Sequence, residues 1–138
     1  MPLYLLDTDH ITLVQRGDPK VTERYADVPE DEIIVSVVSY EEQLRGKLAT
    51  VSQAKTDTQI ERAYWLLLDM QVYFCGLQVV DFGNTEITVY NGLRKPHRRA
   101  ATMDLRIAAT VLTHNATLVT RNTQDFIAIE NLKLENWA

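Results

Sequence analysis

Four acidic residues stand where a parallel α/β sheet would gather them. Asp7 directly follows a short apolar run, and Glu42 falls in the first helical turn predicted after a second run. Asp104 opens a late helical segment, and Asp125 lies five residues past the last strong apolar run. Because the carboxyl ends of parallel strands meet at one edge, where such sheets hold their ligands, we expect these carboxylates to converge.

Carboxylates that share a crevice repel one another, and burying them together would raise the pKa of at least one. A bound divalent cation removes that conflict. Oxygen ligands without histidine or cysteine partners suit Mg²⁺, with Mn²⁺ as a substitute, and do not suit Zn²⁺. Such an ion neutralises a phosphodiester, lowers the pKa of a bound water and stabilises the leaving oxygen. The pattern therefore indicates a nuclease that hydrolyses phosphodiesters with metal-activated water.

Each acid taken singly also fits a local structural role. Asp7 or Asp9 could cap a helix that begins near Ile11, Asp104 could be a helix N-cap, and Asp125 could cap a turn. The metal-site interpretation therefore depends on all four acids lying at one edge of the sheet.

The chain has one dense run of basic residues, immediately before Asp104. A phosphate backbone could bind there while a cation holds the scissile group, although a solvated basic loop has the same composition. The candidate RNA-binding residues in this run are Arg94, Lys95, Arg98 and Arg99.

Neutral polar residues accompany the acids. Thr8 stands beside Asp7, and Thr120 and Asn122 precede Asp125. They could orient the carboxylates or hold metal-bound waters, or serve only as turn residues. We carry them as candidate supporting residues of the site.

The elements that position these residues follow from alternating apolar runs and helical patterns. The predicted strands are residues 3–6, 33–38, 77–80 and 117–120, with an edge strand at 132–137. The predicted helices are 11–15, 21–26, a hairpin over 40–76 with a break near 56–58, 86–93, and 104–113. This order predicts an α/β fold: a three-layer α/β/α sandwich with a mostly parallel sheet.

Length and composition limit the remaining possibilities. A chain of 138 residues with no linker fits a single domain, residues 1–138. The net charge of −5 does not by itself attract polyanions, so nucleic-acid binding must be local or metal-bridged. The single cysteine, Cys75, excludes an internal disulfide and a cysteine-rich zinc site, and we expect a core thiol. The first residues lack a signal peptide or membrane span, which favours the cytoplasm.

Four segments in order resemble the PIN-domain ribonucleases of the VapC toxin type. They are LLDTD at 5–9, SYEEQLRG at 39–46, MDLRIAA at 103–109 and TLVTRNTQDF at 117–126. The resemblance extends to the ending LKLENW at 132–137. Two positions depart from the family pattern: Ala101 replaces a frequent glycine, and Asp9 stands where asparagine is frequent and could add negative charge to the metal site.

The resemblance implies a Mg²⁺-dependent endoribonuclease from a prokaryotic type II toxin–antitoxin system. Its substrates would be tRNA or ribosomal RNA, and its partners a cognate antitoxin and a second copy in a homodimer. The spacing to Gly46 selects Glu42 over Glu41. Relatives often carry the fourth acid earlier, at the place of Asn122, so Asp125 and Asn122 both stay candidates. The implied catalytic and metal-binding residues are Asp7, Glu42, Asp104 and Asp125.

The apolar residues 65–68 exceed what one core-facing helix stripe needs. The resemblance assigns this region to the antitoxin and the dimer, whereas a helix buried on two sides would have the same composition.

Two other functions fit part of the pattern. A haloacid-dehalogenase-type phosphatase would use Asp7 as a nucleophile and Asp9 as its acid, but it needs a separate lysine, a later paired-aspartate motif and a cap. A receiver-like Mg²⁺-binding module without enzymatic activity would need an acidic pair ending the first strand and a lysine after a late one, where Arg121 stands.

Overall fold

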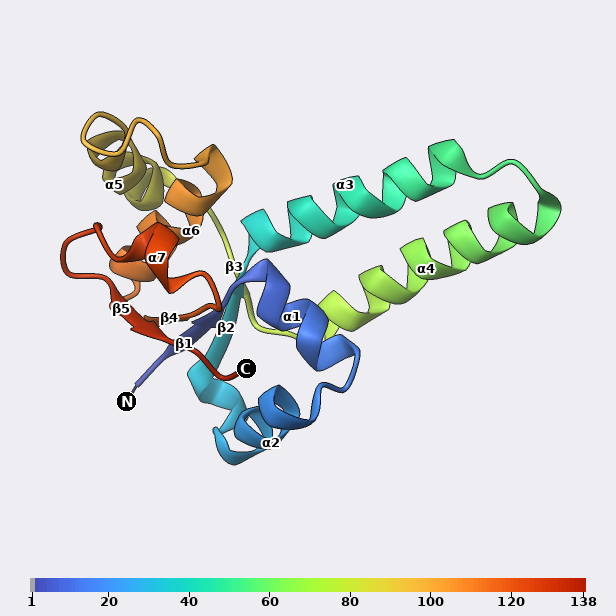
Figure 1. Cartoon of the computed structure of the whole chain (residues 1–138), viewed down its shortest axis with the longest axis horizontal. Coiled ribbons are helices and arrows are strands. Elements are labelled where there is room, and N and C mark those ends of the chain that lie inside the picture. Colours follow the sequence, from blue (N-terminus) through green and yellow to red (C-terminus); the bar gives the residue numbers. More distant parts are fainter. Residues whose placement is uncertain (1) are drawn as a thin grey trace.

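The protein is described by a computed structural model that covers residues 2–138. Its core is a five-stranded sheet in the order β3-β2-β1-β4-β5, in which every pairing is parallel (Figure 1). The strands are β1 (Tyr4–Leu6), β2 (Ile33–Ser36), β3 (Val79–Val80), β4 (Thr117–Val119) and β5 (Lys133–Glu135). The predicted parallel sheet and its late edge strand are confirmed.

Helices cover both faces of this sheet. They are α1 (Thr8–Gln15), α2 (Pro19–Asp27), α3 (Val37–Gln53), α4 (Asp57–Cys75), α5 (Asn84–Arg94), α6 (Thr102–Thr113) and α7 (Thr123–Phe126), with a 3-10 turn at Glu30–Glu32. Leu5 and Leu118 pack with residues of α5 and α6, whereas Leu6 and Val119 pack with residues of α1, α2 and α4. Because successive strand residues point to opposite faces, one strand serves two cores. The predicted three-layer sandwich is confirmed.

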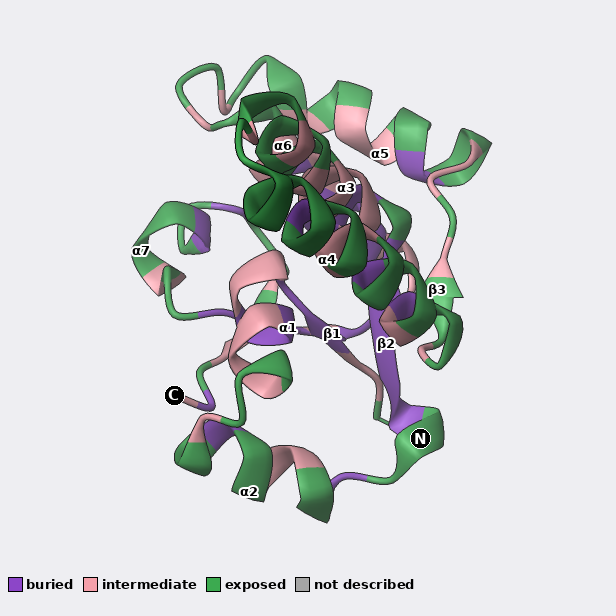
Figure 2. Ribbon diagram, turned by 90° about the vertical axis from the view of Figure 1, so that its right-hand side faces the viewer, coloured by how far each residue is buried: buried purple, intermediate pink, exposed green. Residues whose placement is uncertain are grey.

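The hairpin of α3 and α4 extends away from the sheet (Figure 1). Its break lies where the sequence predicts it, because Thr56 caps α4 and accepts a hydrogen bond from Gln59 N, while the Gln59 side chain accepts from Thr56 N. Figure 2 shows that its outer surface is largely exposed, in contrast to the buried β1 and β2.

The second strand is shorter than the sequence pattern predicts. The β-branched run 33–38 predicts six strand residues, but β2 ends at Ser36 and α3 begins at Val37. The cause is a cap: the Ser36 hydroxyl accepts a hydrogen bond from Val38 N at 3.0 Å. Glu42 therefore lies in the second turn of α3, and the prediction of the first turn is wrong.

Two further local expectations are wrong. Asp104 is not an N-cap, because Ala101 occupies that position and Asp104 follows in the first turn of α6. Cys75 is exposed and is not a core thiol. The buried side of α4 carries Ala63, Met70 and Phe74, and Cys75 lies one position beyond it, about 100° around the helix.

The strand register aligns the carboxyl ends of three neighbouring strands. Leu6 aligns with Val35 on one side and with Val119 on the other, so three strands end at nearly the same level. The chain builds the sheet outward from β1 to β3 and then crosses to place β4 on the other side of β1. Such a reversal between neighbouring strands opens a crevice at their carboxyl ends. Asp7 and Thr120 follow β1 and β4 at this point.

Candidate functional site

Asp7 is held at the start of α1 by its own helix. It is the N-cap residue, and its Oδ1 accepts a hydrogen bond from His10 N at 2.8 Å. The residue is 8% exposed, so a charged group lies almost buried at the carboxyl end of the central strand. The local capping role and a place in the site therefore hold together for the same side chain.

Glu42 reaches the same edge from α3. Thr8, the first residue of α1, donates a hydrogen bond to Glu42 Oε1 at 2.9 Å, and the Thr8 hydroxyl also lies 2.9 Å from Ser39 Oγ. Ser39 is fully buried. This contact ties α1 to α3 and sets the direction of the Glu42 carboxylate.

The charges of the four acids act on one another. Burial raises the pKa of Glu42; the hydrogen bond from Thr8 opposes this rise, and the charges of Asp104 and Asp7 add to it. Burial also raises the pKa of Asp104, with Asp125 and then Asp7 adding to the rise. The structure therefore places Glu42 and Asp104 near Asp7, and Asp125 near Asp104, close enough for their charges to interact. We refer to these four residues as the acidic cluster.

Asp9 does not add an uncompensated charge to this cluster. Both of its oxygens bind Arg121, at 2.6 Å from Nε and 2.8 Å from Nη2. A bidentate pair of this kind is strong and directional. Ligand atoms of Asp7, Asp9 and His10 also lie within 4.8 Å of one another, but the Arg121 pair engages Asp9 and the His10 ring is fully buried.

The donor set of the acidic cluster fits a divalent cation. It offers carboxylate oxygens from three helices and the end of β1, and the pKa of Glu42 and of Asp104 is raised, so uncompensated negative charge is concentrated there. All-oxygen ligands of this kind suit Mg²⁺ or Mn²⁺. Asp7, Glu42, Asp104 and Asp125 are the residues that would hold it.

The basic run lies next to the acids in space. A cleft of about 590 Å³ is lined by Arg98 and Arg99 together with Asp104 and Asp125. A neighbouring cleft of about 640 Å³ is lined by residues that include Arg94, Lys95 and Arg98. All four cations are exposed and none forms an ion pair with any residue in the range 2–138. They are therefore available to an anionic ligand.

Thr120 and Asn122 take turn roles in the structure. Thr120 is fully buried and its hydroxyl accepts a hydrogen bond from Asn122 N at 3.0 Å. Asn122 is the N-cap residue of α7 and its carbonyl accepts from Asp125 N at 3.0 Å. These contacts shape the turn that carries Asp125, and Asp125 is the residue of this turn that lines the cleft with Asp104.

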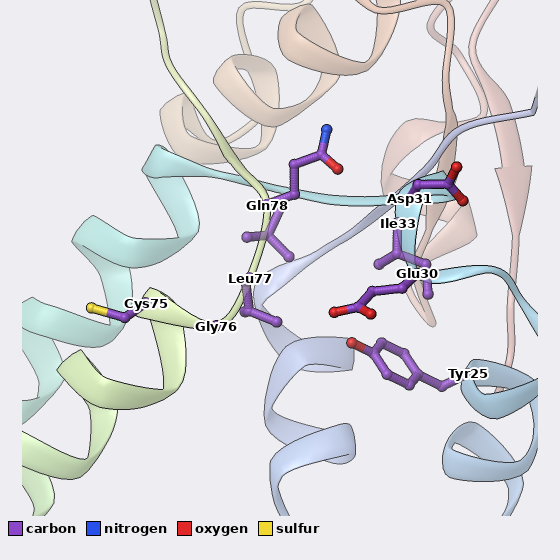
Figure 3. Close-up of a pocket in the computed structure, with 9 residues that line it drawn as sticks. Tyr25, Glu30, Asp31, Ile33, Cys75, Gly76, Leu77 and Gln78 are labelled. Carbon is purple, nitrogen blue, oxygen red and sulfur yellow. The ribbon is translucent and has the colours of Figure 1, made fainter.

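A further cleft, of about 560 Å³, lies at the opposite edge of the sheet (Figure 3). It is formed where β2 begins and where the chain approaches β3, and the Tyr25 phenol faces the Glu30 carboxylate in it. Burial raises the pKa of Tyr25, and the charge of Glu30 adds to the rise. None of the four clustered acids belongs to this cleft.

His10 and Arg121 are the functional neighbours that sequence reasoning missed. His10 contacts Asp7 and Arg121 contacts Asp9, and neither belongs to the set of residues that the sequence analysis assigns to the site. The signal for His10 is its place three residues after an N-cap aspartate, where a helix brings the two side chains together. No local signal pairs Arg121 with Asp9, because they are far apart in the chain.

We expect the Glu42→Gln variant to melt at a higher temperature than the unchanged protein in chelator at pH 7.5. The raised pKa of Glu42 means that its contribution to stability is full below about pH 4.5 and is lost as the pH rises through the folded value. Glutamine has no charge to lose, so the difference in Tm should grow from pH 4 to pH 7.5 in favour of the variant. Differential scanning fluorimetry at each pH measures the Tm of the variant and of the unchanged protein.

The neighbouring Glu41→Gln variant is the matched control. Glu41 pairs with the exposed Arg45 side chain at 2.6 Å and should change stability little in either direction. A Glu42→Gln variant that melts below the unchanged protein at pH 7.5 in chelator would contradict the electrostatic account. Adding Mg²⁺ should raise the Tm of the unchanged protein more than that of the variant.

No helix within residues 2–138 combines the length and apolar character that crossing a bilayer requires.

Comparison with known proteins shows which family this chain and its fold resemble. The family model described as PIN domain matches residues 4–132. Ribonuclease VapC1 of Haemophilus influenzae (strain R2866) is 29% identical over 142 aligned residues, with 98% of each chain covered. A chain in the structure of VapBC2 from Rickettsia felis, bound to a promoter DNA fragment, is 27% identical with a TM-score of 0.75 over 99% of both chains.

A chain in DNA-bound VapBC from Salmonella typhimurium has a TM-score of 0.76 with 21% identity, over 100% of both chains, and supports the fold alone. The resemblance that the four sequence segments carry is confirmed by the family match. With that match running from β1 into the approach to β5, this protein belongs to the PIN-domain family.

Proposed function

We propose that this protein is a Mg²⁺-dependent endoribonuclease and the toxin of a type II toxin–antitoxin system. One observation supports the proposal most: carboxylates from distant segments lie near one another, and burial, with the neighbouring negative charges adding to it, raises the pKa of Glu42 and of Asp104. A structural role does not require such a cluster, whereas binding of a divalent cation does. A curated relative named Ribonuclease VapC1 aligns with 98% of the chain.

In this proposal Asp7, Glu42, Asp104 and Asp125 would hold the ion directly or through water. When bound, the ion supplies positive charge for the phosphate oxygens and acidifies the attacking water. Thr8 keeps the Glu42 carboxylate in one orientation through its hydrogen bond. We expect products with 5′-phosphate and 3′-hydroxyl ends.

Incubation of the purified protein with total RNA tests the activity. We expect cleavage in Mg²⁺ or Mn²⁺ and none in excess chelator, with tRNA or ribosomal RNA as the cut species. Release of inorganic phosphate from small phosphate esters, without any cut RNA, would instead support a phosphatase that uses Asp7 as its nucleophile. Metal binding without either reaction would support a receiver-like module.

The basic run is proposed to hold the RNA backbone beside the acids. We expect the double variant Arg98→Ala/Arg99→Ala to bind a catalytically inert single-stranded RNA about 10-fold more weakly, because it loses two phosphate contacts next to Asp104. The slope of log affinity against log salt should fall by about 1.4, at ~0.7 for each contact on a single strand. Fluorescence anisotropy over a salt series measures both quantities.

The matched control is Lys20→Ala/Arg62→Ala, which removes the same charge from exposed positions on α2 and α4. An equal loss of RNA affinity in both double variants would mean that only net charge matters, and it would remove the basic run from the proposed interface.

The apolar outer face of α4 is proposed to receive the antitoxin. Trp65, Leu68 and Val72 are 57%, 62% and 63% exposed, so the alternative of a helix buried on two sides is wrong. Large exposed apolar side chains on one helix face typically mark a protein interface. We propose a homodimer in the same assembly and a cytoplasmic location.

We expect Trp65→Ala to weaken binding of the proposed cognate antitoxin by about 30-fold or more, since buried tryptophans at interfaces contribute ~2 kcal/mol or more. RNA cleavage by the free variant should be unchanged, because Trp65 lies in α4 and none of the four acids belongs to that helix. Calorimetric titration measures the affinity. An exposed Glu61→Ala change on the same helix is the control, and equal binding by Trp65→Ala would exclude this face.

A further inference from the structure

His10 is the one fully buried titratable side chain beside the acidic cluster within the described range 2–138. It lies in the first turn of α1 and contacts two parts of the chain that are distant in sequence. Its Nδ1 lies 3.2 Å from Asp7 Oδ1, and its Nε2 accepts a hydrogen bond from Trp137 N at 3.4 Å. The imidazole therefore joins the C-terminal segment to the candidate metal ligand at the end of β1.

These contacts assign the tautomer of the ring. The backbone N–H of Trp137 can only donate, so the Nε2 that faces it carries no proton. In the neutral ring the proton is then on Nδ1, which donates to the Asp7 carboxylate. A hydrogen bond from the backbone thus decides which ring nitrogen serves Asp7.

The hydrogen bonds from His10 to Asp7 involve only one carboxylate oxygen. Oδ1 accepts from His10 N at 2.8 Å and from His10 Nδ1 at 3.2 Å, so two donors of the same residue occupy it. The second oxygen, Oδ2, forms no hydrogen bond with any residue in the range 2–138. The carboxylate is held in one rotamer with one oxygen free for a cation.

The Trp137 amide is itself well anchored. The side chain of Trp137 is 6% exposed, its ring contacts that of Tyr4 with centroids 5.5 Å apart, and its Nε1 donates to Glu135 at 3.0 Å. The guanidinium of Arg24 lies 5.4 Å from the indole ring. The donor that holds His10 therefore belongs to a rigid part of the fold.

We propose that His10 is a positioning residue that transmits the fixed place of the Trp137 amide to Asp7, and so pre-organises the Asp7 carboxylate for a divalent cation. The proposal rests on the proposed metal-dependent function. Groups that orient a metal-binding carboxylate typically change metal affinity about 10- to 100-fold when they are removed. A histidine that only fills core volume would have no such effect.

Two substitutions separate orientation from packing. In His10→Asn the side-chain amide nitrogen takes the place of Nδ1 and still donates to Asp7. In His10→Gln the amide group takes the place of Nε2, so the side-chain donor to Asp7 is lost. Both remove the buried ring and should lower the Tm. We expect Mn²⁺ affinity, measured by calorimetric titration, to fall about 10-fold in His10→Gln and less than about 3-fold in His10→Asn.

Val21→Ala is the packing control, because Val21 is fully buried in the same core as α1 and makes no hydrogen bond to any of the four acids of the cluster. It should lower the Tm without changing Mn²⁺ affinity. Equal affinities in the two His10 variants, whether both unchanged or both reduced, would overturn the proposal and leave His10 a packing residue. Failure of the unchanged protein to bind Mn²⁺ would overturn the metal-dependent function as well.

A measurement on the unchanged protein does not depend on the folding of any variant. Nitrogen-15 spectra of the histidine-labelled protein distinguish a ring protonated on Nδ1 from one protonated on Nε2. We expect the Nδ1-protonated pattern for His10, and its persistence when Mn²⁺-free Mg²⁺ is added. The Nε2-protonated pattern would overturn the proposal, because that ring could not donate to Asp7.

Discussion

The Asp7→Asn variant should lose RNA cleavage by a factor of about 10³ while keeping its fold. Asparagine retains the side-chain oxygen that accepts from His10 N, so the cap of α1 survives. It removes the negative charge that the proposed ion needs. A metal ion contributes several kcal/mol to the transition state, and ~4 kcal/mol corresponds to about 10³ in rate. Initial rates on a single RNA species in Mg²⁺ measure the loss.

Asp18→Asn is the matched control for this variant. Asp18 is the N-cap residue of α2 and accepts a hydrogen bond from Val21 N at 3.1 Å, so it has the same capping role away from the cluster. It should cleave RNA at the rate of the unchanged protein. Cleavage by Asp7→Asn at an undiminished rate would remove Asp7 from the mechanism, and with it the proposed role of His10.

The Leu118→Ala variant should instead lose stability. Leu118 is fully buried in β4, in register with Leu5 on one side and Leu134 on the other. Truncating a leucine at such a site leaves a cavity that costs ~3 kcal/mol. For a chain of this size that corresponds to a fall in Tm of about 10 °C. Urea and thermal unfolding followed by circular dichroism give both values.

Ile127→Ala is the control for this substitution, since Ile127 is 75% exposed and its truncation should change stability by less than ~0.5 kcal/mol. If Leu118→Ala melted within about 2 °C of the unchanged protein, the sheet centre would not be the main source of stability that its burial indicates. RNA cleavage by the folded fraction of Leu118→Ala should be normal, in contrast to Asp7→Asn.

Much of the architecture was predictable from the chain, because its signals are local. The alternation of apolar runs with helical spacing predicted five parallel strands and the break before α4, and the cap at Thr56 lies at that break. The errors are also local. Val37 and Val38 favour a strand by type, but a single hydrogen bond to Ser36 ends the strand two residues before the predicted end and starts the helix at Val37.

The candidate site was likewise predictable from the sequence in part only. Its four acids were predictable because each follows or opens an element whose end must lie at the carboxyl edge of a parallel sheet. Their combined electrostatics were not, since the pKa of Glu42 is raised first by its burial and then by the charges of Asp104 and Asp7, all of which depend on the tertiary structure. The relation of the basic run to that cluster likewise depends on how α6 and α7 enclose one cleft.

The amino-acid sequence by itself therefore determined the layers, the order of elements and which carboxylates lie near the carboxyl edge of the sheet, because periodicity and capping act over a few residues. Only the tertiary structure decided that Arg121 neutralises Asp9 and that the Trp137 amide holds His10 against Asp7. These contacts join residues more than a hundred positions apart. Their geometry is set by strand register and helix packing, and no local pattern in the chain encodes it.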